Sequence, residues 1–185
     1  MNTLKIYWPF KPYIITQAWG VKNDDYLPLG FDHHNGIDAI NGSNRTKWPV
    51  YCPVDGFKVT EVAFYPKGGG KQIGMVSKQK LQIGDKLCFV SIILCHADKV
   101  LVPVGYEPVL GEMITVADNT GFSTGAHTHM GMYRLNDDLS KMDSNDETGS
   151  YDPSLCFANA FAVDQASLAT LIKSDWRYYQ YVLGY

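Results

Sequence analysis

The chain has 185 residues and a formal net charge of −3 at pH 7, which is the size of a single domain. Hydrophobic residues make up 45% of the chain and charged residues 19%, a balance typical of a folded globular protein. The lack of a basic excess argues against nucleic acid as a partner. No apolar run reaches the roughly 18 residues of a membrane-spanning helix, so we expect no transmembrane segment.

The N-terminal stretch reads MNTLKIYWPF, with one lysine and no apolar core before Pro9. This is not the pattern of a secretory signal peptide, so we expect a protein that is made in the cytoplasm. None of the four cysteines, Cys52, Cys88, Cys95 and Cys156, forms a CxxC pair. Free buried thiols are therefore expected, although four cysteines could also form two disulfides.

Short β-type runs recur along the chain between turn signals. Residues 57–64 (FKVTEVAF), 86–94 (KLCFVSIIL) and Met113–Ala117 (MITVA) are examples, and glycine-rich or Asp-Asn turns separate them. This spacing predicts a mainly β fold built on an antiparallel sheet.

The C-terminal residues 164–181 are the exception to this β pattern. Leu168, Leu171, Ile172 and Trp176 recur there at helical spacing, which predicts an amphipathic α-helix packed on the sheet. In a rival interpretation the aromatic residues of 176–181 near the end form a platform that stacks on sugars.

The five histidines are distributed unevenly, and four of them lie in two tight clusters. The first cluster, residues 32–38 (DHHNGID), disfavours a helix because of Asn35-Gly36. In an extended segment His34, Gly36 and Asp38 share a face, and the glycine leaves room there for an ion. An imidazole with a carboxylate is a common zinc ligand pair. The alternative is a histidine and an aspartate that simply meet in a turn.

The second cluster follows a glycine-rich turn at 119–125, where the chain carries His127-Thr128-His129. In a strand His127 and His129 share a face, so one can bind a metal while the other stands beside a water molecule. A pair of surface histidines is the alternative. It is the weaker one, because the first cluster supplies the missing ligands.

Together these motifs resemble a known family. Residues 34–38 (HNGID), 48–50 (WPV) and 54–56 (VDG) are similar to the H-x-G-x-D, G-x-P-V and D-G-x-V motifs that open the lysostaphin/LytM-type zinc endopeptidases, peptidase family M23. Residues 120–129 (TGFSTGAHTH) resemble the closing motif of that family, T-G-x-S-T-G-P-H-L-H. His96 stands where the family has a strand that ends in a histidine. The resemblance covers roughly residues 14–157.

The resemblance implies roles for individual residues. His34, Asp38 and His129 would hold Zn²⁺ and leave its fourth tetrahedral position open to water. His96 and His127 would flank that water, where a neutral imidazole can take its proton and a protonated one can stabilise the oxyanion. The sequence departs from the family motifs at some positions, such as Ala126 in place of proline and Gly131 in place of glutamate. These departures affect the shape of the active-site groove and remove no metal ligand.

The implied function is hydrolysis of peptide bonds in bacterial peptidoglycan by a zinc endopeptidase. Two alternatives remain: a catalytically inactive scaffold or wall-binding module of the same fold, and a zinc D,D-carboxypeptidase. We expect a monomer with a peptidase domain at residues 1–157 and a helical extension at 158–185. A wall hydrolase without a signal peptide is typical of a phage endolysin or a virion-associated lysin that acts at the cell wall.

Overall fold

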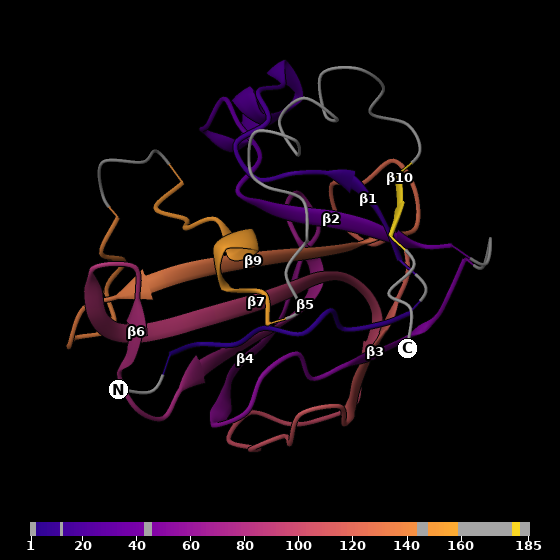
Figure 1. Cartoon of the computed structure of the whole chain (residues 1–185). Helices are drawn as coiled ribbons and strands as arrows, with labels where there is room; N and C mark the ends of the chain where they lie inside the picture. Colours follow the sequence, from indigo (N-terminus) through magenta and orange to yellow (C-terminus); the bar gives the residue numbers. More distant parts are fainter. Residues whose placement is uncertain (1–2, 12, 43–45, 144–147, 159–178, 182–185) are drawn as a thin grey trace.

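The computed structural model describes residues 3–11, 13–42, 46–143, 148–158 and 179–181 (Figure 1). In this part of the chain the fold is mainly β, with two short 3₁₀ helices. The strands are β1 (Tyr13–Gln17), β2 (Gly36–Asn41), β3 (Pro49–Tyr51), β4 (Phe57–Tyr65), β5 (Gly70–Ser77), β6 (Leu81–Ile83), β7 (Lys86–Val100), β8 (Met113–Ala117), β9 (Thr128–Leu135) and β10 (Tyr179–Tyr181). The 3₁₀ helices are η1 (Asp24–Leu29) and η2 (Pro153–Cys156).

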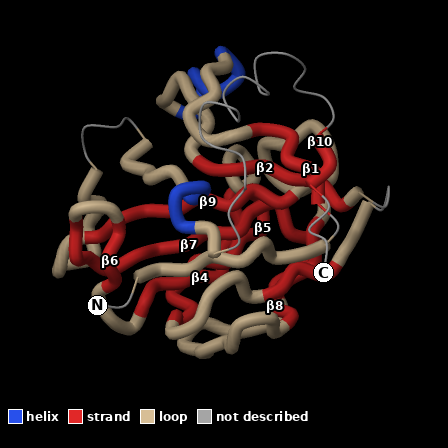
Figure 2. The backbone as a smooth tube through the Cα atoms, viewed as in Figure 1, coloured by secondary structure: helices blue, strands red, loops and turns tan. Residues whose placement is uncertain are grey.

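The strands form one antiparallel sheet, as predicted. Its main path runs β10-β1-β2-β9-β7-β5-β4, and β3, β6 and β8 branch from it (Figure 2). The runs predicted as strands coincide with β4, β7 and β8. The long strand β7 pairs with β5 on one side and with β9 on the other, so it ties the sheet together.

Alternation within the strands explains which face is buried. In β4, Phe57 and Val59 are buried and Lys58 and Thr60 are exposed, which is the period of two of a half-buried strand. In the first part of β7 the buried apolar residues follow the same period, at Cys88, Val90, Ile92 and Leu94. These side chains form one continuous apolar face of the sheet.

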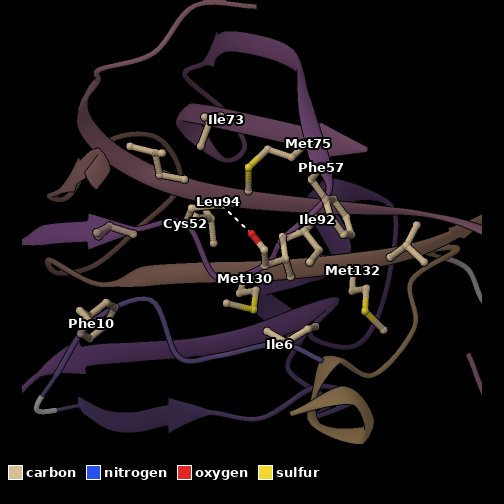
Figure 3. Packing of buried hydrophobic residues seen from close by; sticks show 14 of the residues in the cluster. Ile6, Phe10, Cys52, Phe57, Ile73, Met75, Ile92, Leu94, Met130 and Met132 are labelled. Atoms are coloured by element: carbon tan, nitrogen blue, oxygen red, sulfur yellow. Dashed lines mark hydrogen bonds between the residues drawn. The ribbon is translucent and has the colours of Figure 1, made fainter. Parts of the chain in front are cut away.

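The N-terminal segment 3–11 covers part of this apolar face. Ile6 and Phe10 from this segment belong to the same buried cluster as Ile92 and Met130 of the sheet (Figure 3). The backbone N–H of Ile6 donates to the carbonyl of Cys156 at 2.9 Å, which fixes the segment next to η2. Burial of each such side chain contributes about 1.5–3 kcal/mol before entropy, so the lead-in segment is part of the domain.

The C-terminal prediction is in part outside the described residues and in part wrong. Residues 164–178 of the predicted helix lie outside them, and the boundary drawn between residues 157 and 158 stays a prediction. Residues 179–181 form the edge strand β10, antiparallel to β1, and not a helical turn. Tyr-Gln-Tyr has a high strand propensity, and β1 offers it unpaired backbone groups. No helix of the described residues is long and apolar enough to cross a membrane.

The four cysteines all lie among the described residues, and none of them forms a disulfide. Cys52, Cys88 and Cys95 are buried and Cys156 is partly buried. The prediction of free thiols is therefore confirmed.

Candidate metal centre

The register between β2 and β9 creates the centre of the site. Asp38 and His129 are direct cross-strand partners, so their side chains share one face of the sheet. Their neighbours Ile37 and Met130 are buried. Since Met130 packs in the core, the polar pair projects from the opposite face of the sheet.

His34 reaches the same face from the segment that leads into β2. Its backbone N–H donates to the carbonyl of Val21 at 2.9 Å, and its Nδ1 lies 3.0 Å from the carbonyl oxygen of Ala18. A carbonyl oxygen only accepts hydrogen bonds, so Nδ1 carries the proton. In the neutral ring Nε2 then presents its lone pair to the site.

Three potential metal ligands converge at this point. His34 Nε2 lies 3.0 Å from His129 Nδ1 and 3.1 Å from Asp38 Oδ1, and the last two atoms are 2.9 Å apart. With both imidazoles neutral, only His129 Nδ1 could carry a proton among these three lone-pair atoms. A cation between them would satisfy all three.

The donor set fits zinc. Ligand atoms bound tetrahedrally at the usual Zn–N and Zn–O lengths are about 3.3 Å apart, so the three atoms need to spread by only a few tenths of an ångström. His34, Asp38 and His129 are also the one group of potential metal ligands found among the described residues. The cluster therefore has the chemistry and the size of a three-ligand zinc site.

The charge states in the cluster suit metal binding. Burial alone would raise the pKa of Asp38, but the neighbouring His34 and His129 outweigh it and hold that pKa well below its usual value. Burial lowers the pKa of His129 and favours its neutral form, although Asp38 opposes this shift. An ionised carboxylate beside a neutral imidazole is the protonation state that a divalent cation requires.

His127 stands beside this cluster. Its Nδ1 lies 2.8 Å from the carbonyl oxygen of Gly125 and 3.1 Å from Ser123 Oγ, so Nδ1 donates to the carbonyl. Its Nε2 is left facing Asp38 Oδ2 at 3.5 Å. The imidazole is therefore directed at the carboxylate with its lone pair.

His96 is the second imidazole beside the cluster, and a β-bulge directs it there. Cys95 pairs with His129, so regular alternation would turn Cys95 to the site face and His96 to the core. His96 instead has a φ of 63°, and the pairing of β7 with β5 shifts register at this position. The Cys95 thiol is buried, and it is not among the three converging potential ligands.

The bulge brings the two flanking imidazoles together. The ring centroids of His96 and His127 are 4.4 Å apart. Burial, together with the nearby His127 and His129, lowers the pKa of His96 to about 4. His96 Nδ1 lies 2.7 Å from the carbonyl oxygen of Thr120, so Nδ1 carries the proton and Nε2 the lone pair.

Tyr26, from η1, completes the surroundings. Its ring stacks on the His34 imidazole with centroids 5.6 Å apart, and its hydroxyl donates to Gln17 Oε1 at 2.7 Å. Burial, and then the charge of Asp38, raises the pKa of Tyr26. Sequence motifs gave no sign of Gln17 and Ala18, which contact the site only through the tertiary structure.

Comparisons with known proteins agree with this arrangement. No protein-family model matches the chain. An uncharacterized metalloprotease of Haemophilus influenzae is 33% identical over 96 residues, which are 52% of this chain but 18% of that protein. The match thus spans less than a fifth of that curated relative.

Two solved structures share the fold. A zinc containing peptidase from Vibrio cholerae aligns at 25% identity and a TM-score of 0.55, over 71% of this chain and 36% of its own. The catalytic domain of the antimicrobial peptidase lysostaphin from Staphylococcus simulans aligns at 23% identity and a TM-score of 0.54, over 74% of this chain and 86% of its own.

The fold of the described residues is thus similar to that of known peptidase domains, and it carries a His-Asp-His cluster. The resemblance to the lysostaphin/LytM-type peptidases of family M23 is confirmed.

Proposed function

We propose that this protein is a zinc-dependent endopeptidase that hydrolyses peptide bonds of bacterial peptidoglycan. The observation that carries the proposal is the convergence of His34, Asp38 and His129 within 2.9–3.1 Å, with His96 and His127 beside them. Similar proteins that are named as a metalloprotease, a zinc containing peptidase and an antimicrobial peptidase support it.

In this proposal His34 Nε2, Asp38 Oδ1 and His129 Nδ1 hold the zinc ion. When bound, zinc supplies Lewis acidity and lowers the pKa of water at its open position toward about 7. The carbonyl of Ala18 keeps His34 in the tautomer whose Nε2 is free to bind. Such a contact behind a ligand fixes its orientation as well as its tautomer.

The two flanking imidazoles move and hold protons. Nε2 of His127 accepts a proton from the attacking water, because its Nδ1 is committed to the Gly125 carbonyl. The protonated His127 can then return that proton to the leaving amine. His96, whose pKa is about 4, stays neutral and accepts a hydrogen bond at Nε2.

The inactive-scaffold alternative predicts that a ligand or a flanking histidine has been lost. The chain retains all five residues, and their side chains meet in one place. This favours an enzyme over a scaffold or a wall-binding module. A site of action at the cell wall, as an endolysin or a virion-associated lysin, is part of the proposal. So is a monomeric state.

Mass spectrometry of digested cell walls tests the proposal. The zinc-loaded full chain is incubated with purified walls of several chemotypes, some with glycine-rich cross-bridges and some with direct D-Ala to diamino-acid links. New amine termini at a cross-link are expected, and His127→Ala is the inactive control. Release of only terminal D-alanine from free stem peptides would indicate a D,D-carboxypeptidase. No cleavage of any wall by a zinc-loaded chain would favour the scaffold.

A further inference from the structure

The left-handed backbone of His96 is held by two loops that pack tightly on each other. His96 N donates to the carbonyl of Gly69 at 2.8 Å, and the N–H of Asp118 donates to the carbonyl of His96 at 3.0 Å. Histidine enters this region of φ at a cost, so the surrounding structure must impose it. The bulge therefore depends on the loop at 67–70 and on the loop at 118–122.

Two glycines permit the contact between these loops. Gly70 has a φ of 64° and Gly121 a φ of 81°. A Cβ on Gly70 would lie 2.3 Å from the carbonyl oxygen of Thr120, and a Cβ on Gly121 would lie 2.2 Å from the nitrogen of Gly70. Neither position has room for a side chain.

Thr120 joins these loops to two strands. Its hydroxyl donates to the carbonyl of Ala97 on β7 at 2.8 Å and accepts from the N–H of Lys71 on β5 at 3.0 Å. Its carbonyl oxygen accepts from His96 Nδ1 at 2.7 Å. Thr120 thus holds the loop in place and keeps the imidazole proton of His96 on Nδ1.

We infer that Thr120 is a positioning residue for His96: its hydroxyl anchors the carbonyl that holds the imidazole in the Nδ1–H tautomer with Nε2 toward the site. The geometry alone carries the inference about the tautomer of His96. The expected effect on catalysis rests, in addition, on the proposed function. Without the anchor, the ring can rotate or exchange tautomers, and Nε2 no longer presents a lone pair. The loss would appear in kcat and leave KM nearly unchanged.

The first test replaces the hydroxyl. Thr120→Val keeps the shape of the side chain and removes both of its hydrogen bonds, whereas Thr120→Ser keeps the hydroxyl. A matched control is Thr115→Val, because Thr115 is buried and its hydroxyl also donates to a β7 carbonyl, that of Lys99, at 2.7 Å. Thr115 has no contact with His96 among those described, so its loss tests stability alone.

The readout is ¹⁵N NMR of the histidine rings in the zinc-loaded full chain, with the His96 signals identified by their loss in His96→Asn. We expect the Nδ1–H tautomer of His96 in the wild type, a tautomer mixture in Thr120→Val, and recovery in Thr120→Ser. Because a positioned proton-transfer group contributes about 10²–10⁴-fold, kcat should fall about tenfold or more in Thr120→Val. Thr115→Val should leave both readouts unchanged.

A second pair of variants displaces the carbonyl directly. Gly70→Ala places a methyl group against the Thr120 carbonyl, and Gly56→Ala is its control, because Gly56 has a φ of 74° with nothing within 4 Å of the added Cβ. Both variants bear the backbone penalty of a positive φ, and only Gly70→Ala should change the His96 tautomer. An unchanged tautomer in both Thr120→Val and Gly70→Ala would overturn the inference. Failure of the wild type to cleave any wall would instead count against the proposed function, since the tautomer is read without hydrolysis.

Discussion

Gly36 lies directly against the imidazole of His129, across the pair of strands that builds the candidate metal centre. A Cβ at position 36 would be 2.6 Å from His129 Cε1 and 2.5 Å from the carbonyl oxygen of Met130. No real Cβ makes contacts this short, so a side chain here must move the ring or the strand. The glycine between His34 and Asp38 therefore makes room for the third ligand as much as for an ion.

Gly36→Ala should weaken zinc binding, because the displaced His129 Nδ1 no longer meets the other two donor atoms. Loss of a contact that orients a ligand typically lowers metal affinity 10–100-fold, and we expect about 100-fold here. Competition with a chromophoric chelator measures the affinity. Gly68→Ala is the control, since its added methyl group would meet nothing closer than Tyr65 Cβ at 3.8 Å. Equal affinities of the two variants would contradict this role of Gly36.

Removal of zinc should lower the thermal stability of the wild type and not that of Asp38→Ala. A ligand present at 1,000 times its Kd stabilises a folded protein by about 4 kcal/mol, which corresponds to roughly 10 °C for a chain of this size. Differential scanning calorimetry with and without a chelator measures the change. If Asp38→Ala retains one zinc per chain by elemental analysis, the assignment of Asp38 as a ligand is wrong.

His127→Ala should strongly reduce hydrolysis while zinc stays bound. Its Nε2 approaches Asp38 Oδ2 at 3.5 Å, but the ring stands outside the triangle formed by the three ligand atoms. We expect kcat to fall by about 10²–10⁴-fold with little change in metal content. His129→Ala is the comparison and should lose both zinc and activity. If His127→Ala also loses its zinc, His127 is a metal ligand like His129 and not a separate proton-transfer group.

The low pKa of His96 predicts a loss of stability in acid for the metal-free protein. The unfolded chain takes up a proton at this residue near pH 6.5, whereas the folded chain does so only near pH 4. The free energy of unfolding should therefore fall as the pH drops through this window, by on the order of 3 kcal/mol from His96 alone.

Urea unfolding at pH 7 and pH 4.5 measures this dependence. His96→Asn is the matched variant, because asparagine tolerates a positive φ and does not titrate. The variant should lose less stability between the two pH values, and the remaining slope belongs to groups such as His129, whose pKa is also lowered. Parallel losses in the two proteins would show that His96 is not responsible.

The sequence by itself determined the strand-forming runs and pointed to the residues of the candidate site. The period of two in β4 and β7 reports which side chains face the core, and it placed His34 and Asp38 on one side of an extended segment. Local alternation carries this information because successive Cβ atoms in a strand point to opposite faces. The resemblance to the M23 family supplied the order of the remaining motifs.

Only the tertiary structure decided which residues pair with each other across the strands. Alternation cannot say that Asp38 pairs with His129, since register is set between strands that lie 91 residues apart in sequence. It also cannot place His96, because two loops impose a left-handed residue there and shift the register. In the same way, β1 pairs with residues 179–181, which the local spacing had assigned to a helix. In each case backbone groups distant in sequence outweigh a local preference, because hydrogen bonds between strands form only in the assembled sheet.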